Sequence, residues 1–249
     1  MEKLLQATLN IVRSVGEQLF VEVSRSYAYT LVAKFGNRKY LMKIAADAED
    51  VSSSAIKDLK LLSKYTNVTS LCIVSGVKGQ VLRRGVVYLR DNFVFMSLST
   101  FTDILNGKEP AYRVSRGTIT AMIDGKKLRE LRERAGMSLS AVAEQLGVTR
   151  ETVYRYERGE IEAPLRIAEK LVQMFGDDVI RKVDIWKPPE LTQEELRSRR
   201  VADETYRLIE SHPDAIKIEK RVVFVSTNRD KYEKTEELAN ALGVEVVKA

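Results

Sequence analysis

The sequence is poor in the residues that bind metals or cross-link chains. Its 249 residues include one cysteine, Cys72, and one histidine, His212. A disulfide within the chain is therefore excluded, and neither a Cys/His zinc cluster nor a cysteine–histidine catalytic dyad is expected. Cys72 lies in an apolar run, Leu71 to Val74, which indicates a buried and unreactive thiol. His212 precedes Pro213 at an expected helix end, where we interpret it as a capping or surface residue.

Long hydrophobic runs are also lacking. No run approaches the roughly 18–20 apolar residues that a membrane-spanning helix needs. The first 20 residues are interrupted by Arg13 and Glu17, and their apolar residues have the spacing of an amphipathic helix rather than a signal peptide. We therefore expect a cytoplasmic protein with no membrane partner.

The positive charge is modest and unevenly distributed. The net charge is +6, and 44% of the residues are hydrophobic, which is enough to build compact cores. Residues 1–123 hold 17 basic and 10 acidic side chains, residues 124–176 hold 10 and 9, and residues 177–249 hold 14 and 16. Any attraction to a polyanion should therefore come mainly from the N-terminal part.

Residues 1–113 have the pattern of an α/β domain. Apolar periodicity and turn signals predict the order helix, three strands, helix, strand, followed by a hairpin and a short helix. The expected elements are a helix over 2–18, strands over 20–24, 27–35 and 39–45, a helix over 52–65, a strand over 71–75, a hairpin of 86–89 with 93–97, and a helix over 99–106. This order predicts helices packed on a mixed sheet.

The rest of the chain divides into two further parts. We expect a strand over 114–123 that leads into a mainly helical domain, residues 114–183. Pro188-Pro189 marks a linker, and residues 184–249 should form a small α/β unit. Its expected elements are a helix over 192–211, a strand over 221–226, a helix over 231–242 and a strand over 244–247. Such a unit is too small to bury its own core, so we expect it to dock on the N-terminal sheet or on a partner chain.

The helical segment is divided by residues that end and begin helices. Gly136 ends a first helix, Ser138 caps a second, Gly147 ends it, Thr149 caps a third and Gly159 closes the third. Helices this short are unstable alone in water, so they must bury apolar stripes against one another.

The third helix, residues 149–157, has two different faces. At about 100° per residue, Val153 and Tyr156 lie on an apolar side. The opposite side presents Arg150, Glu151, Tyr154 and Arg155. Arginine can form two hydrogen bonds to guanine in the major groove, and glutamate can accept one from cytosine. In the alternative interpretation, Glu151 and Arg155 merely form an ion pair on a solvated face.

This segment resembles the helix-turn-helix of Cro/repressor-type (Xre-like) regulators. The resemblance covers about a fifth of the chain and implies a compact domain of four or five helices. It implies that helix 149–157 enters the major groove and that the protein is a homodimer on a two-fold site. The matching residues are Leu131, Arg132, Gly136, Ser138, Val142, Ala143, Gly147, Val148, Val153, Tyr156, Glu157 and Gly159.

The resemblance also suggests roles for individual residues. It implies that Arg132 and Glu157 form a structural ion pair between the first and third helices. Where the family commonly has glutamine at the start of the second helix, this chain has Leu139, so only a backbone N–H remains there. The implied base contacts are Arg150, Glu151 and Arg155, with Tyr154 on the same face, and the implied phosphate contacts are Ser138, Leu139 and Thr149.

The order of elements in residues 1–75 is similar to the core of the PD-(D/E)xK nuclease and Holliday-junction-resolvase fold. Such enzymes need clustered carboxylates that hold Mg²⁺ and a lysine near the attacking water. Lys43 is present, but Leu41 stands where the acid should be, and the preceding strand carries Lys34 and no acid. Asp47, Glu49 and Asp50 lie in a bend, where an acidic cap before helix 52–65 is the simpler interpretation. The sequence therefore predicts a catalytically inactive member of this fold, with no metal and no cofactor.

A basic run lies outside the helix-turn-helix. It consists of Lys78, Arg83, Arg84 and Arg90, which could contact DNA phosphates or could form a charged strand edge that discourages aggregation. The layout of the whole chain resembles a group of archaeal predicted transcriptional regulators. The leading hypothesis is a homodimeric, sequence-specific regulator of transcription that binds double-stranded DNA and is not an enzyme.

Two other functions remain open. One is a metal-dependent nuclease or junction enzyme that finds its substrate through the helix-turn-helix. The other is a bridging factor that binds the transcription machinery, although a cysteine-rich zinc ribbon is lacking. Cleavage that depends on Mg²⁺ would indicate the first, and failure to bind any duplex would favour the second.

Overall fold

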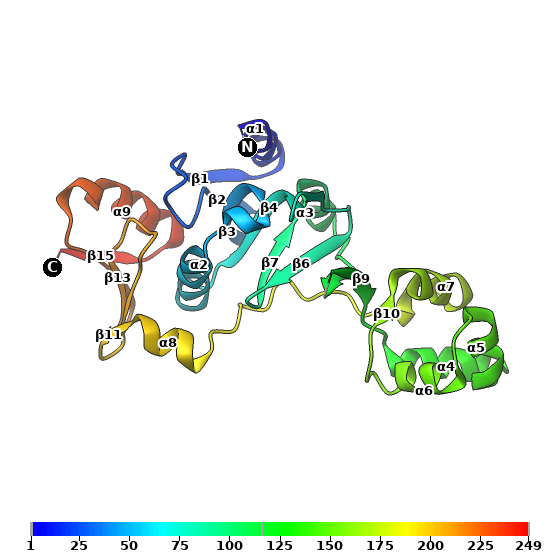
Figure 1. The fold of residues 1–249 in the computed structure, drawn as a ribbon. Coiled ribbons are helices and arrows are strands. Elements are labelled where there is room, and N and C mark those ends of the chain that lie inside the picture. The colour runs from blue at the N-terminus through cyan, green and yellow to red at the C-terminus, as the bar shows by residue number, and fades with distance from the viewer. Residues whose placement is uncertain (1, 116, 249) are drawn as a thin grey trace.

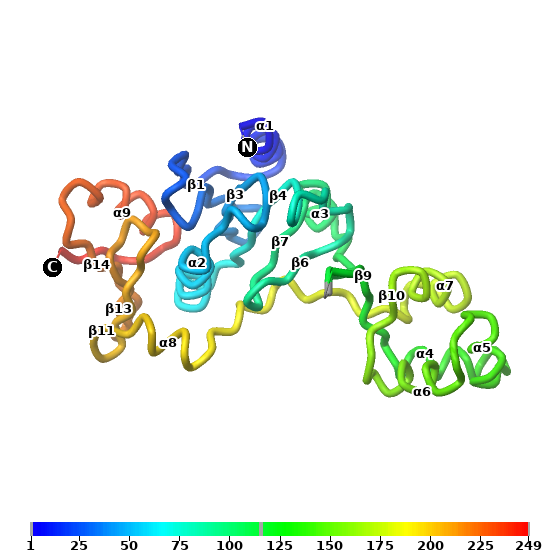
Figure 2. The backbone as a smooth tube through the Cα atoms, in the orientation of Figure 1, coloured from blue at the N-terminus to red at the C-terminus, as the bar shows by residue number. Residues whose placement is uncertain are grey.

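The computed structural model describes residues 2–115 and 117–248. Figure 1 shows a central sheet with its helices, a helical unit at one end and a smaller sheet at the other end. Figure 2 shows that the chain, after leaving the helical unit, runs back past the central sheet to reach the small sheet. None of the helices within the described ranges is long and apolar enough to cross a membrane.

The N-terminal part has the predicted order of helix, three strands, helix and strand. Its first helix ends before the predicted residue 18, because Gly16 packs against Phe35 so closely that a Cβ on Gly16 would lie 2.5 Å from Phe35 Cδ1. The elements are α1 (Glu2–Val15), β1 (Glu17–Val21), β2 (Leu31–Phe35), β3 (Arg38–Asp47), α2 (Ser53–Thr66), β4 (Thr69–Val77), β5 (Gln80–Val81), β6 (Val86–Arg90), β7 (Phe93–Met96) and α3 (Leu98–Leu105).

These strands form a mixed sheet, as predicted. Its order runs β1-β2-β3-β4-β7-β6, in which β3–β4 and β4–β7 are parallel and the other neighbours are antiparallel. Helices α1 and α3 cover one face, with Val12 and Phe101 buried beside Met42. Helix α2 covers the other face, with Ile56 and Leu59 buried in a second cluster. The α/β assignment of the N-terminal domain is therefore confirmed.

The strand predicted over residues 114–123 is wrong in form, because this segment is a hairpin. Strands β8 (Tyr112–Ser115) and β9 (Thr118–Ala121) pair antiparallel, and Gly117 at φ +79° turns the chain between them. Strand β8 adds to β6, and β9 pairs with β10 (Ala163–Pro164) inside the helical unit. We call β8, β9 and β10 the neck. Through the neck the central sheet continues into the helical unit.

The helix predicted over residues 192–211 is also wrong. Helix α8 (Gln193–Arg199) is short, and beyond it buried Tyr206 and Leu208 alternate with exposed neighbours, which is the period of a strand. A five-stranded sheet follows, with strands in chain order. Its elements are β11 (Arg200–Ala202), β12 (Thr205–Arg207), β13 (Ala215–Ile218), β14 (Val222–Ser226), α9 (Arg229–Leu242) and β15 (Glu245–Lys248).

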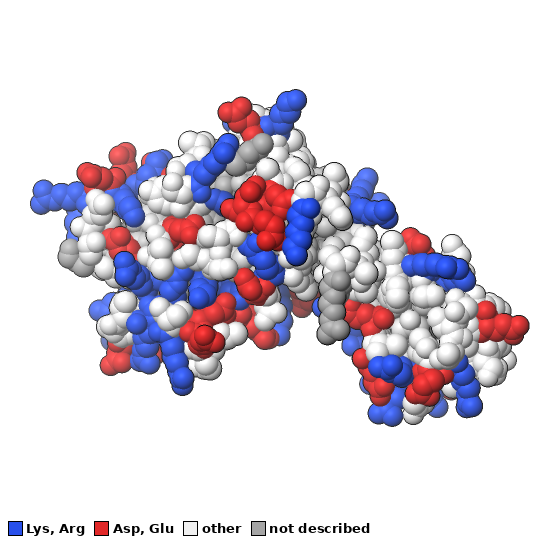
Figure 3. All heavy atoms as spheres, viewed as in Figure 1, with Lys and Arg blue, Asp and Glu red and all other residues white. Residues whose placement is uncertain are grey.

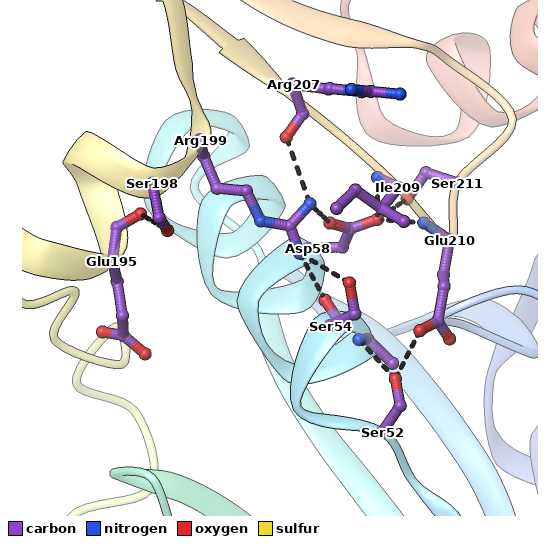
Figure 4. Close-up of polar contacts among 11 residues, drawn as sticks. Ser52, Ser54, Asp58, Glu195, Ser198, Arg199, Arg207, Ile209, Glu210 and Ser211 are labelled. Atoms are coloured by element: carbon purple, nitrogen blue, oxygen red, sulfur yellow. Dashed lines mark hydrogen bonds and ion pairs between the residues drawn. The ribbon is translucent and has the colours of Figure 1, made fainter.

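This C-terminal unit docks on α2 of the N-terminal part. Figure 4 shows Arg199 reaching from the end of α8 to Asp58 of α2, with Nη1 3.1 Å from Oδ1. Arg199 Nη2 donates to the carbonyl and hydroxyl oxygens of Ser54, both at 2.9 Å. Asp58 Oδ2 in turn accepts from three donors in the C-terminal unit, Ile209 N, Glu210 N and Ser211 Oγ. Both charged side chains are buried, so this contact joins the two parts through a desolvated ion pair.

His212 is neither a cap nor a surface residue, and that expectation is wrong. Because the predicted helix does not form, His212 lies in a buried loop, where Nε2 is 2.6 Å from Glu22 Oε2 and the ring stacks on Tyr27 at 3.8 Å. Its backbone N–H donates to the hydroxyl of Tyr29. Cys72, by contrast, is buried as predicted, and burial raises the pKa of its thiol.

Candidate functional site

The helical unit is built from four helices around an apolar core. They are α4 (Gly125–Arg134), α5 (Leu139–Leu146), α6 (Arg150–Glu157) and α7 (Leu165–Phe175). The stripes predicted from the sequence meet in this core, which buries Leu128, Val142, Leu146, Val153, Tyr156 and Leu171. Each helix is too short to be stable alone, so this shared core fixes the position of α6.

The ends of α5 and α6 lie at the residues that the sequence indicated. Ser138 Oγ accepts a hydrogen bond from Ala141 N at 3.1 Å, and Thr149 Oγ1 accepts one from Thr152 N at 3.2 Å. Gly147 ends α5 with φ +72°, a left-handed conformation in which a side chain would be strained. Three residues, Gly147, Val148 and Thr149, therefore separate the end of α5 from the start of α6, which sets a sharp turn between them.

Gly125 at the start of α4 lies directly against the end of α6. A Cβ at this position would stand 2.1 Å from the carbonyl oxygen of Glu157. Glycine is therefore required for this close approach. Sequence reasoning missed this role, because a glycine beside Asp124 looks like an ordinary helix start.

Arg132 and Glu157 join the same two helices. Arg132 Nε lies 2.5 Å from Glu157 Oε1, and Nη2 lies 3.3 Å from Oε2. A third donor of Arg132, Nη1, bonds to the carbonyl of Met137 in the turn before α5 at 2.9 Å. The hydrogen bond to Glu157 raises the pKa of Arg132 above its usual value. One guanidinium thus fixes α4, the turn before α5 and the last residue of α6.

The outer face of α6 carries polar side chains. Arg150, Glu151, Tyr154 and Arg155 are all exposed, while Val153 and Tyr156 of the same helix are buried. Arg155 pairs with Glu160 at 3.6 Å rather than with Glu151, the partner that the alternative interpretation required. In Figure 3, basic and acidic side chains gather at the lower edge of the helical unit, where α6 lies in Figure 1. The structure thus brings these four residues together on one accessible face.

Two residues after α6 extend this face and were missed by the sequence analysis. Arg158 Nε lies 2.8 Å from Glu160 Oε1, and its Nη1 donates to the hydroxyl of Tyr154 at 3.4 Å. The hydrogen bond to Tyr154 raises the pKa of Arg158, and the guanidinium lies 5.7 Å from the centre of the Tyr154 ring. The opposite charges of Arg155 and Glu160, which lie close together in the sequence at the end of α6, were the signal that could have indicated this cluster.

The residues considered for nuclease chemistry have structural roles. Leu41 is fully buried in the core, and Lys43 Nζ donates to the carbonyl oxygens of Arg25 and Tyr27. Burial lowers the pKa of Lys43. No group of three His, Cys, Asp or Glu side chains that could hold a metal ion occurs in the described part of the chain.

The acidic bend caps a different helix from the one expected. Asp47 accepts backbone hydrogen bonds from Glu49, Lys78 and Gly79, and it caps the short 3-10 helix 48–50. These backbone donors hold the pKa of Asp47 below its usual value, against the opposing effect of burial. Helix α2 has its own cap, Ser52, so the expectation of an acidic cap on helix 52–65 is wrong in this detail.

The four residues of the basic run, Lys78, Arg83, Arg84 and Arg90, do not act as one group. The Arg90 guanidinium donates to the backbone carbonyl oxygens of Ala48 and Val51. Arg84 bonds to Asp103, with Nε 2.6 Å from Oδ2. Lys78 and Arg83 instead line a groove beside the neck, together with Arg113.

Comparisons with known proteins agree with this division. The family model of the PD-(D/E)XK superfamily domain matches residues 1–110, and that of a helix-turn-helix domain matches residues 125–179. A protein of Pyrobaculum aerophilum named "Putative HTH-type transcriptional regulatory protein" is 63% identical over 248 residues, which span 100% of this chain and 99% of that protein. No solved structure gives a significant match.

Two longer relatives carry the same name. The protein of Methanocaldococcus jannaschii is 29% identical over 187 residues, and that of Pyrococcus furiosus is 32% identical over 187 residues. Both matches span 75% of this chain but only 58% and 59% of the respective relatives. The helix-turn-helix resemblance and the nuclease-like fold of the N-terminal part are thereby confirmed.

Proposed function

Because the chain belongs to the family of archaeal HTH-type transcriptional regulatory proteins, we propose that it regulates transcription by binding duplex DNA at specific sequences. The observation that carries this proposal is the outer face of α6. Arg150, Glu151, Tyr154 and Arg155 are exposed there, on a helix whose other side is fixed by the core and by Arg132. A rigid helix with exposed polar side chains is suited to reading base edges in a major groove.

Each residue of this face has a chemical counterpart on DNA. Arg150 and Arg155 can each donate two parallel hydrogen bonds to guanine O6 and N7, and Glu151 can accept from cytosine N4. Arg155 exchanges its long contact with Glu160 for a base, a small change because that pair is solvent-exposed. Arg158 holds the ring of Tyr154 on the same face. From there the Tyr154 ring can contact a sugar or a thymine methyl group.

Phosphate contacts are proposed at the starts of α5 and α6. Ser138 and Thr149 use their hydroxyl oxygens as helix caps. The Ser138 proton is then able to donate to a phosphate, and the Thr149 proton is able to do so when the Thr152 hydroxyl, 2.9 Å away, donates to Thr149. Leu139 offers its backbone N–H at the start of α5. These contacts position the helix and carry no sequence information themselves.

We also propose that the protein acts as a homodimer on a two-fold site. Helix-turn-helix dimers place their reading helices about one helical turn of DNA apart, roughly 34–36 Å. The assignments 1–113, 114–183 and 184–249 are proposed as the functional parts, in which the helical part reads DNA. The flanking α/β parts would then supply dimerisation.

The N-terminal part is proposed to be inactive as a nuclease. Lys43 donates two of its three N–H groups to backbone carbonyl oxygens, and Leu41 occupies the position of the acid. A hydrolytic site of this fold would need an acid beside the lysine to hold Mg²⁺.

Footprinting of the bound protein on its own genomic DNA tests the proposed function. The expected result is a set of protected sites that share a motif with two-fold symmetry and bind two chains each. Protection without any shared motif would contradict sequence-specific regulation, and one chain per site would contradict the homodimer.

A further inference from the structure

A groove with a volume of about 990 Å³ lies beside the neck. One wall is the turn and loop around β5, including Lys78, Val81 and Arg83. The other wall belongs to the neck hairpin and to Leu165, the first residue of α7. In Figure 1 the strands β6, β9 and β10 mark this place between the central sheet and the helical unit. We call it the neck groove.

The neck groove is cationic. Three of its lining residues, Lys78, Arg83 and Arg113, are basic, and none of the lining residues within the described ranges is Asp or Glu. Lys78 and Arg83 are exposed and form no ion pair with a described residue. Arg113 pairs with Glu162, while its Nε is buried without a hydrogen-bond acceptor in the described part of the chain. The Arg113 guanidinium therefore adds positive charge to the wall of the groove, while its Nε is closed off from solvent.

The floor of the neck groove is apolar. Tyr88 of β6, Val114 of β8 and Ile119 of β9 lie side by side in register across the three strands, and all are only partly buried. Val81 on the rim is 84% exposed, which is unusual for a large apolar side chain. A patch of this kind indicates an occupant with an apolar surface of its own.

We propose that the neck groove binds a nucleotide. Its phosphate would lie between Lys78 and Arg83, on the side of the Arg113 guanidinium, and its base would lie flat against Tyr88 and the neighbouring strands. The volume is at the upper end of the range for small-molecule sites, and such sites combine an apolar lining with a few placed polar groups. Charge-assisted hydrogen bonds to phosphate are the strongest contacts available here.

Duplex DNA offers the same phosphate but does not fit the floor equally well. Its bases are stacked inside, so a duplex would present sugars and phosphates to Tyr88, Val114 and Ile119. A free nucleotide presents both the anion and a flat apolar face. The groove therefore fits the small ligand better than it fits the backbone of a bound duplex.

The position of the neck groove couples it to the helical unit. A ligand that touches both Arg83 and Arg113 holds the N-terminal part against the neck hairpin. If the proposed function is correct, this ligand would act as an effector that sets the orientation of α6 relative to the rest of the chain. Nucleotide binding itself does not depend on DNA binding, so the two proposals can fail separately.

Calorimetric titration of the full-length chain tests the site with the four nucleoside 5′-monophosphates, adenosine and inorganic phosphate as probes. We expect one monophosphate to bind per chain, and adenosine and inorganic phosphate each to bind at least roughly tenfold more weakly than AMP. The double substitution Lys78→Ala with Arg83→Ala should weaken binding by roughly tenfold or more. Arg84→Ala removes a neighbouring charge outside the groove and should leave binding unchanged.

Three results would overturn the nucleotide site. The first is no binding of any monophosphate at millimolar concentration. The second is inorganic phosphate that binds as tightly as AMP, which would mean that the apolar floor is unused. The third is a random-sequence duplex that displaces AMP and loses affinity in the Lys78/Arg83 variant, which would make the groove a contact for the DNA backbone. A chain that binds AMP but no duplex would contradict only the proposed regulation.

Discussion

The guanidinium of Arg132 and the carboxylate of Glu157 form a two-point contact between α4 and α6, at 2.5 and 3.3 Å. The two side chains are only 11% and 7% exposed, so water screens the pair weakly. Because Arg132 also bonds to Met137, the pair ties the helix that carries the reading face to both of its neighbours.

Replacing Glu157 should therefore destabilise the helical unit. In Glu157→Ala the buried guanidinium of Arg132 loses its two-point partner and keeps a longer, 3.4 Å contact with the exposed Glu133, and we expect a loss of about 3–5 kcal/mol in unfolding free energy. Urea unfolding of the full-length chain, followed by hydrogen exchange in α4 and α6, measures this loss. The matched control is Glu130→Ala, which breaks an exposed pair with Arg134 and should cost no more than about 0.5 kcal/mol. Equal effects of the two substitutions would show that the Arg132–Glu157 pair is not special.

Gly125 is predicted to accept no side chain. Gly125→Ala would place a Cβ within 2.1 Å of the Glu157 carbonyl oxygen, and the backbone of α4 or α6 must then move. Overpacking of this kind costs about 1–3 kcal/mol. Thermal unfolding should show a lower transition for this variant and no change for Lys126→Ala, its exposed neighbour. An unchanged Gly125→Ala transition would mean that the helices separate at little cost.

The buried His212 should make stability depend on pH. Burial lowers the pKa of His212, with Lys231 and Lys234 acting in the same direction and Glu22 opposing them. Because the pKa is lower in the folded state, the neutral imidazole stabilises the fold above the unfolded pKa of about 6.5. That contribution is lost as the pH falls from about 6.5 through the lower folded pKa.

Urea unfolding of wild type and His212→Asn between pH 8 and pH 5 measures this dependence. We expect the stability difference between the two proteins to shrink as the pH decreases. A difference that stays constant over the range would show that folding leaves the pKa of His212 unshifted, and one that grows on acidification would show that folding raises this pKa.

Nuclease activity is predicted to be absent. Because Leu41 stands in place of an acid and Lys43 bonds to two carbonyl oxygens, we expect the N-terminal part to hold no catalytic Mg²⁺. Incubation with supercoiled plasmid and with four-way junctions in Mg²⁺ or Mn²⁺ should leave both substrates intact. Cleavage that disappears in Lys43→Ala would contradict this prediction.

The helical unit could be predicted from the sequence because its signals are local. Ser138 and Thr149 cap helices through hydrogen bonds within three residues, and Gly147 ends a helix through its own φ angle. The opposite faces of α6 follow in the same way from the helical period. Local signals do not reveal contacts between helices. The close approach of Gly125 to the carbonyl oxygen of Glu157 is one such contact that they missed.

In the C-terminal unit the predicted strand, helix and strand over 221–247 occur as β14, α9 and β15, but the segment before them could not be predicted because distant partners decide its structure. Charged residues around Arg199 and Glu210 have good helix propensity, yet Arg199 turns toward Asp58 and Glu210 donates its backbone N–H to the same carboxylate. These partners lie about 140–150 residues away in the sequence. His212 was misplaced for the same reason, since its partner Glu22 belongs to the first strand region.

We propose that α6 reads base edges, and the substitutions Arg150→Ala and Arg155→Ala test this role of α6. Each substitution removes a guanidinium from an exposed position, so neither should unfold the helical unit. Each should cost about 1–3 kcal/mol at the specific site and relax discrimination at the contacted base pair. Arg166→Ala on α7 serves as the control, because it removes the same charge from an exposed position on another helix.

Titration of these variants on the footprinted duplex and on a scrambled duplex, at several salt concentrations, is the most direct measurement. We expect the Arg150 and Arg155 variants to lose affinity for the specific duplex and to lose much less for the scrambled one. Arg166→Ala should affect the two duplexes equally. Equal losses on both duplexes would show that these residues contact only phosphates. Folded variants that bind the specific duplex as tightly as wild type would contradict the claim that α6 is the reading helix.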